Sequence, residues 1–190
     1  MPVVDAVVFD LGNVLIEWNP RLLLSDAFIA ETDFFAWNAE LDQGASFAEV
    51  VARVRREFPH FAEECDAFRD RWPELLGPVD QDVLAIVDDL REAGVPVYVL
   101  SNSSAETLPR SPIVVDLLAR FDGVLVSGEV GLLKPDPAIY ELAVARFGLV
   151  PAHTLFIDDS PANVDAAIAC GWQGHLFTEA VLIPTGGRSS

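Results

Sequence analysis

The chain has 190 residues, 51% of them hydrophobic, which is long enough for one domain with an insertion and too apolar for disorder. Its net charge of −18 excludes the basic face that nucleic acid requires. No apolar window reaches about 18 residues, and residues 1–5 lack a basic region before an apolar core, so we expect neither a membrane segment nor a secretory signal. Two distant cysteines, Cys65 and Cys170, favour a reduced cytoplasmic setting over a disulfide scaffold.

The first predicted element is a strand over residues 3–9. This β-branched apolar run is typical of a strand buried on both faces of a parallel sheet. The run ends at Asp10, with Gly12 and Asn13 just beyond it. A carboxylate at the carboxyl end of such a strand lies where open α/β sheets bind ligands. Taken alone, Asp10 could equally well start a turn.

A helical segment is predicted to follow, with β character stopping after Leu15. Asn19 and Pro20 predict a helix start, continuing to Ile29. Further helices are predicted from the aromatic pattern at 34–41, from the capping box at 46–49, and over 60–76 with a bend or an end near Pro73. We therefore expect residues 17–78 to form an all-helical insertion after the first strand.

Strands and helices alternate in the rest of the chain. Helices are predicted at 80–93, 112–120, 137–147 and 160–169, and strands at 95–100, 123–126, 154–157 and 175–177. The end of the chain from Pro184 is expected to fray. The alternation predicts an α/β fold with a doubly wound, parallel, five-stranded sheet, built from residues 1–16 and 79–190.

Polar residues follow three of these predicted strands. They are Asp10, the pair Ser101-Asn102 and the pair Asp158-Asp159, and Lys134, the only lysine, lies in a loop between two of them. Three carboxylates in one crevice repel one another unless a cation holds them, and oxygen ligands suit Mg²⁺. A lysine and a hydroxyl beside a metal predict a phosphate site.

These residues resemble the four motifs of the haloacid dehalogenase superfamily, at positions 9–15, 100–102, 131–135 and 158–163. The Asp-Leu-Gly-Asn-Val form of the first motif resembles the sugar-phosphatase branch related to the phosphatase domain of epoxide hydrolases. The resemblance implies a Rossmann-like core with a helical cap at 17–78. It also implies a Mg²⁺-dependent phosphatase that works through an aspartyl phosphate and acts on a small phosphorylated metabolite, with sugar phosphates as the leading class.

The resemblance also implies a role for each motif residue. Asp10 is the expected nucleophile, and Lys134 and Ser101 are expected to act with it. The expected metal ligands are Asp10, the carbonyl of Gly12, Asp158 and Asp159, with Asp158 also able to orient Lys134. The expected phosphate and substrate contacts are Leu11, Gly12, Ser101, Asn102, Lys134 and Trp18, the last because it leads into the insertion.

One position departs from the family pattern. The usual phosphatases carry an acid/base aspartate two residues after the nucleophile, where this chain has Gly12. The absence of a group worth about 10²- to 10⁴-fold in rate suggests a slow enzyme, a substrate with a good leaving group, or a proton relay from the cap. Two alternatives remain: a catalytically weak phosphate- or metabolite-binding module, and a metal-independent 2-haloacid dehalogenase, which has no need of Asp158-Asp159. A monomer or homodimer without nucleic-acid or membrane partners is expected.

Simpler interpretations accompany several assignments. Lys134 could be a surface lysine, and Asp158-Asp159 an N-cap pair. Asn163 is expected to brace the fourth motif. Surface or core positions are expected for three histidines, three cap aromatics and three arginines: His60, His153 and His175; Phe34, Phe35 and Trp37; Arg53, Arg55 and Arg56.

Overall fold

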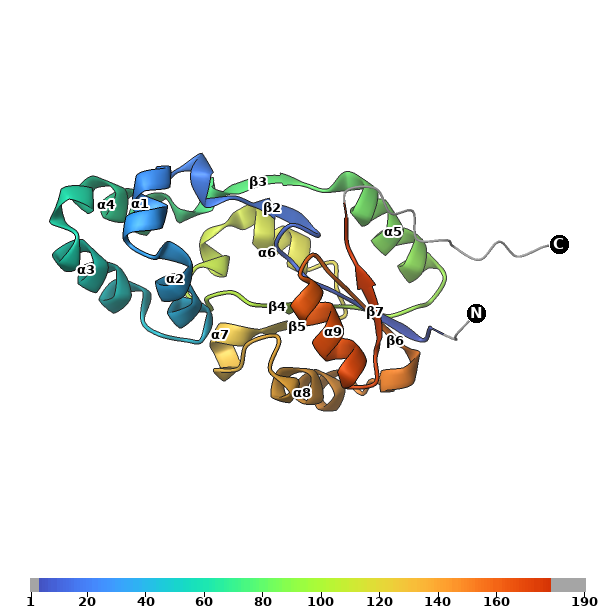
Figure 1. Cartoon of the computed structure of the whole chain (residues 1–190). Coiled ribbons are helices and arrows are strands. Elements are labelled where there is room, and N and C mark those ends of the chain that lie inside the picture. The colour runs from blue at the N-terminus through green and yellow to red at the C-terminus, as the bar shows by residue number, and fades with distance from the viewer. Residues whose placement is uncertain (1–3, 179–190) are drawn as a thin grey trace.

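A computed structural model describes residues 4–178 and contains a five-stranded parallel sheet (Figure 1). The strand order is β5-β4-β1-β6-β7, and every neighbouring pair is parallel. The strands are β1 (Ala6–Phe9), β4 (Val97–Ser101), β5 (Gly123–Val126), β6 (Thr154–Asp158) and β7 (Gln173–Leu176). The predicted α/β class with a five-stranded parallel sheet is confirmed.

Helices cover both faces of this sheet. Val7 and Phe9 of β1 belong to the core beneath α5 (Gln81–Glu92) and α6 (Pro112–Leu118). Ala6 and Val8 point to the opposite face, where they join the core beneath α8 (Pro137–Phe147) and α9 (Pro161–Ala169). Because side chains alternate along a strand and both faces are covered, β1 is apolar at every position. The two layers are visible in Figure 1.

The helical insert, residues 19–75, leaves and rejoins the sheet through a two-stranded ribbon. Strands β2 (Ile16–Trp18) and β3 (Leu76–Val79) pair antiparallel, with Ile16 opposite Val79. The insert lies at one end of the molecule, on the left in Figure 1. Its α-helices are α1 (Asp26–Glu31), α2 (Phe34–Asp42), α3 (Phe47–Glu57) and α4 (Ala62–Arg71), packed around buried Phe28, Phe34, Trp37 and Phe68.

Three sequence expectations for this region are wrong. β character does not stop at Leu15, because β2 follows it and finds a partner in β3. The helix expected from Asn19 to Ile29 is a 3₁₀ turn, Pro20–Leu22, followed by α1, because Ser25 accepts the Phe28 N–H and starts a new helix. The helix expected over 60–76 ends at Arg71 and is followed by a 3₁₀ turn containing Pro73, so the predicted end near Pro73 is correct but Leu76 opens β3.

The remaining elements fall close to their predicted places. One short helix, α7 (Ser127–Val130), was not predicted, and 3₁₀ turns occupy Pro59–Phe61, Leu108–Arg110 and Pro151–His153. The expectations for Val3 and for the chain from Pro184 concern residues outside the described range. Across residues 4–178, no helix combines the length and apolarity needed to cross a bilayer.

Most of the aromatic, arginine and histidine side chains that were expected to have ordinary core or surface positions do have them. Phe34 and Trp37 are buried, whereas Phe35 is 52% exposed. Both cysteines are free. Arg53 and Arg55 pair with acids of the insert surface, Glu40 and Asp66, and His60 and His153 lie near Glu31 and Asp5.

Candidate active site

The parallel strands bring Asp10 to the carboxyl edge of the sheet. Its backbone N–H donates to the carbonyl of Ile157 at 2.8 Å, which continues the pairing of β1 with β6 and fixes the point where the chain leaves the sheet. The Asp10 carboxylate oxygen Oδ1 lies 2.7 Å from Lys134 Nζ. The side chain of Asp10 is 12% exposed, so part of it is open to solvent.

Lys134 is buried and held from both its main chain and its side chain. Its side chain is 1% exposed, so the surface-lysine interpretation is wrong. Nζ lies 2.7 Å from Asp158 Oδ2 as well as from Asp10. The Asn102 side chain accepts the Lys134 N–H and donates to its carbonyl, each at 2.9 Å. The end of β4 therefore positions the loop that carries the lysine.

Asp158 is completely buried and fully hydrogen-bonded. Besides Lys134, it receives the Ser160 N–H at 2.8 Å and the Asn163 Nδ2 at 3.0 and 3.1 Å. Tyr140 in turn donates its hydroxyl to the Asn163 carbonyl at 2.8 Å. Because both Asp158 oxygens are engaged, this carboxylate serves chiefly to fix Lys134 and the start of α9.

Burial and mutual interaction set the charges of this group. Burial raises the pKa of Asp10 to about 6, with Lys134 opposing the rise and Asp158 adding to it. Burial alone would lower the pKa of Lys134, but the charges of Asp10 and Asp158 outweigh it and raise that pKa above its usual value. At neutral pH the site therefore holds an ammonium between carboxylates, with a net negative charge.

Asp159 completes a set of three carboxylates that suits a hard cation. One oxygen each from Asp10, Asp158 and Asp159 lie within 4.8 Å of one another. Asp159 is the exposed member, and its Oδ2 accepts from Asn13 Nδ2 at 3.2 Å. One ammonium does not neutralise three carboxylates, and an all-oxygen donor set fits Mg²⁺.

A cavity of about 160 Å³ opens beside these carboxylates, between the sheet edge and the helical insert. From the sheet side it is lined by Asp10, Leu11, Gly12, Asn13, Asn102, Ser103, Ser104, Thr107, Leu108, Val114 and Asp159. From the ribbon and the insert it is lined by Ile16, Trp18, Asn38, Leu41, Asp42, Trp72 and Leu76. The wall away from Asp10 and Asp159 therefore combines apolar side chains with neutral polar ones and the Asp42 carboxyl.

The structure brings most of the predicted site residues to this cavity. Leu11, Gly12, Trp18 and Asn102 line it, and Lys134 and Asp158 lie behind Asp10. Ser101 is not part of its wall: the side chain is buried, and its hydroxyl lies 2.8 Å from that of Ser103, which does line the cavity.

Sequence reasoning missed five polar residues of the cavity wall, namely Asn38, Asp42, Ser103, Ser104 and Thr107. Ser103 lies two positions beyond the predicted Ser101, where strand alternation offered a signal for it. Asn38 and Asp42 come from α2 of the insert. No sequence spacing relates α2 to the sheet edge, so nothing in the sequence identified them.

Comparisons with known proteins match nearly the whole chain. A family model for haloacid dehalogenase-like hydrolases matches residues 4–171. A sesquiterpene phosphatase of Aspergillus oryzae is 27% identical over 183 residues, which cover 93% of this chain and 91% of that protein. The (S)-2-haloacid dehalogenase 2 of a Pseudomonas species is 30% identical over 93 residues, covering 49% of this chain and 41% of that protein.

The fold is shared with a solved structure. A HAD family enzyme from Bacteroides thetaiotaomicron, solved with magnesium and inorganic phosphate, superposes with a TM-score of 0.69 at 22% identity. The match covers 95% of this chain and 98% of that one.

Proposed function

The chain belongs to the haloacid dehalogenase-like hydrolases, and from this premise we propose that it is a Mg²⁺-dependent phosphatase of small phosphate monoesters. The grouping of Asp10, Asp158 and Asp159 around the single lysine, at the floor of a cavity, carries the proposal. The phosphatase relative and the magnesium and phosphate complex of the structural relative support it.

In this proposal Asp10 is the nucleophile and Lys134 keeps it ionised. An Asp10 oxygen attacks phosphorus, the ester oxygen departs with its electron pair, and water later hydrolyses the aspartyl phosphate. Lys134 donates to Asp10 and Asp158 and is buried behind the nucleophile, so it fixes the Asp10 oxygen from outside the cavity. Asn102 contributes its backbone N–H and holds Lys134 in place.

The metal would be held by the carboxylates of Asp10 and Asp159 and by the carbonyl of Gly12, with Asp158 behind them. When bound, Mg²⁺ offsets the charge of the carboxylates and of the phosphoryl group. In this proposal the phosphate contact first expected for Ser101 is made by the hydroxyl of Ser103, which is hydrogen-bonded to that of Ser101.

We assign the helical insert, within the expected 17–78 boundaries, the role of a substrate-selecting cap. Trp18, Trp72 and Leu76 give the cavity apolar walls, and no lysine, arginine or histidine among the described residues lines it. This lining favours an ester whose alcohol has an apolar surface over the sugar phosphates first expected.

A phosphate-release assay over sugar, aryl and alkyl phosphates tests the function. We expect release that requires Mg²⁺ and is lost in Asp10→Asn, with higher kcat/KM for the apolar esters. Undiminished release in excess chelator would contradict the proposal.

The dehalogenase alternative rests on the Pseudomonas relative. Halide release from 2-chloropropionate without Mg²⁺, in the absence of phosphatase activity, would favour it. Phosphate binding with no turnover of either substrate class would favour a binding module.

A further inference from the structure

The cavity contains one carboxyl group that the proposed chemistry has not used. Within residues 4–178, the acidic residues of its wall are Asp10, Asp159 and Asp42. The first two follow strands of the sheet, whereas Asp42 is the last residue of α2 in the helical insert. Asp42 therefore lines the same cavity as Asp10, but from the helical insert and not from the sheet.

Contacts from both sides hold Asp42 in place. Its Oδ2 accepts from Asn38 Nδ2 at 3.0 Å, one turn earlier in α2, and the carboxyl also accepts the backbone N–H of Ser104 from the sheet side. The backbone carbonyl of Asp42 accepts the Ser127 hydroxyl at 2.5 Å. These contacts anchor the end of α2 across the boundary between insert and sheet.

The surroundings of Asp42 favour its protonated form. Burial raises the pKa of Asp42 to about 7, and the negative charge of Asp10 adds to the rise, while the Ser104 amide and Asn38 oppose it. A carboxylate at the C-terminus of a helix is also disfavoured by the helix dipole. Both side-chain partners are donors, so a proton on Asp42 has no acceptor among them and is available to the cavity.

Gly12, on the sheet side of the cavity, provides no carboxyl group of this kind. The glycine occupies the position two residues after the nucleophile, and a Cβ added there would lie 3.6 Å from Trp18 Cβ. No side chain therefore extends from this position into the cavity.

We propose that Asp42 is the general acid and base of the reaction, delivered from the helical insert in place of the residue that Gly12 lacks. The assignment rests on the phosphatase function proposed above.

The proton balance of both half-reactions follows from this position. In the first, Asp10 bonds to phosphorus, the bond from phosphorus to the ester oxygen breaks, and that oxygen takes the proton of Asp42 and leaves as the alcohol. In the second, the Asp42 carboxylate takes a proton from water while the water oxygen bonds to phosphorus. The bond from phosphorus to Asp10 then breaks, which frees the Asp10 carboxylate and inorganic phosphate and leaves Asp42 protonated again.

A purely structural Asp42 is the competing explanation, since Asn38 and Asp42 form an ordinary pair one helical turn apart. The two explanations differ in one observable. Loss of a structural contact slows both steps on all esters alike, whereas loss of the acid slows formation of the aspartyl phosphate most strongly for esters with a poor leaving group.

The experiment compares Asp42→Asn with Asp33→Asn in the full chain with Mg²⁺, on nitrophenyl phosphate and benzyl phosphate. Asp33 is an exposed aspartate just before α2 and makes no side-chain cap hydrogen bond. For Asp42→Asn we expect kcat on benzyl phosphate to fall by about 10²- to 10⁴-fold. Nitrophenyl phosphate should give a burst of about one nitrophenol per enzyme and then slow turnover, because its leaving group needs no acid but the aspartyl phosphate lacks its base.

Each result separates this inference from the proposed function. If Asp42→Asn matches Asp33→Asn on both esters, the assignment of Asp42 is wrong while the phosphatase function stands. If the wild-type protein hydrolyses neither these nor the other esters, the proposed function itself fails. Should Asp42→Asn not fold, Asp42→Ala is assayed with added formate: recovery of benzyl phosphate turnover supports the assignment, and no recovery in a folded variant overturns it.

Discussion

Burial in the folded protein disfavours the ionised form of Asp42, so the protonation of this side chain should also affect stability. Its pKa of about 7 in the folded protein lies above the ordinary value of 3.8. The contribution of protonated Asp42 to the free energy of unfolding is therefore fully present below pH 3.8 and is lost as the pH rises through about 7. The charged groups around it are Asp10 and Asp159 across the cavity, with Lys134 behind Asp10.

We therefore predict that Asp42→Asn is relatively more stable at pH 8 than at pH 4.5. The neutral amide avoids the buried charge, so the change in relative stability should be on the order of 2 kcal/mol. Urea unfolding in metal-free buffer measures it, and Asp33→Asn should show no such trend. A difference between Asp42→Asn and wild type that does not vary with pH would contradict the prediction.

Gly12 offers a second test at the scale of one residue. Its φ is not positive and the nearest side-chain atom to an added Cβ is at ordinary contact distance, so the chain can accept a larger residue there. We predict that Gly12→Asp folds and adds little to wild-type turnover of benzyl phosphate. In the Asp42→Asn background it should recover part of the lost rate, because a carboxyl again reaches the leaving group.

The double-mutant comparison makes this prediction sharp. Two acids that serve the same oxygen must give non-additive effects on kcat. Equal fold-changes for Gly12→Asp in both backgrounds would show that the two positions act independently.

The contact between α2 and α7 links the helical insert to the sheet. The buried Ser127 hydroxyl donates to the carbonyl of Asp42 and accepts the N–H of Ser103 at 2.9 Å. It thereby joins the cap side of the cavity to the loop after β4. Removal of this hydroxyl leaves both backbone groups without that partner.

We predict that Ser127→Ala destabilises the protein by about 1–3 kcal/mol and lowers kcat more for benzyl than for nitrophenyl phosphate. The second effect arises because Asp42 and Ser103 lose their common anchor. Thr154→Val is a matched control, since Thr154 is also buried, its hydroxyl donates to the backbone carbonyl of Val150 at 2.9 Å, and it begins β6, at the opposite end of that strand from the cavity. A similar loss of stability with equal effects on both esters is expected for that control, and the same pattern in Ser127→Ala would contradict the prediction.

The elements of the sheet could be predicted because their local signals agree with their burial. The helix over 137–147 coincides with α8, since Asp136 caps it, Pro137 begins it and Gly148 ends it. Strands buried on both faces also stand out as apolar runs. The ribbon of β2 and β3 could not be predicted in this way, because its partners are about 60 residues apart and Gly77 and Pro78 are weak strand formers.

The residues of the candidate site also differ in whether the sequence could predict them. Asp10, Asn102, Asp158 and Asp159 follow predicted strands, so topology alone brings them to one edge. Asp42 reaches the cavity only through the tertiary placement of α2. Ser101 does not line the cavity, because its side chain is buried at the end of β4. Hydrophobic patterning does not encode the direction of that side chain.

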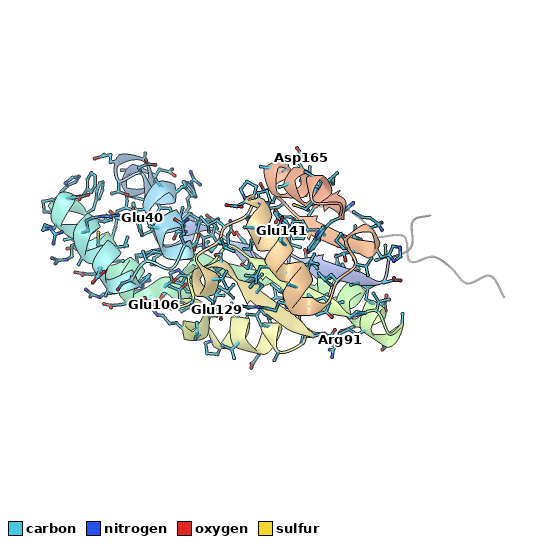
Figure 2. The ribbon with its side chains drawn as sticks, turned by 90° about the horizontal axis from the view of Figure 1, so that it is seen from below. Glu40, Arg91, Glu106, Glu129, Glu141 and Asp165 are labelled. Carbon is cyan, nitrogen blue, oxygen red and sulfur yellow. The ribbon has the colours of Figure 1, made fainter. Side chains whose placement is uncertain are left out.

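The molecule as a whole is strongly acidic, and the acids are spread over its surface. Figure 2 labels Glu40 on the helical insert, Glu129, Glu141 and Asp165 over the sheet-covering helices, and Arg91 near the other end. With a net charge of −18 and no basic side chain in the described cavity wall, an anionic ester approaches against repulsion.

We predict that kcat/KM for a phosphate ester rises with ionic strength at saturating Mg²⁺. Raising the salt from about 0.01 to 0.1 M shortens the screening length from about 30 to 10 Å, which should increase kcat/KM severalfold through KM. An equal increase with an uncharged additive such as sucrose, or a decrease with salt, would contradict this explanation.

Because Lys134 is buried, its chemical reactivity can report how often the sheet edge opens. Apart from the terminal amine, this lysine is the only primary amine in the sequence, and its side chain is 1% exposed between two carboxylates. An acylating reagent can therefore reach it only when the sheet edge opens. The rate of acetylation of Lys134 by mass spectrometry, relative to the unfolded chain, reports the free energy of that opening, at a single atom and without any introduced label.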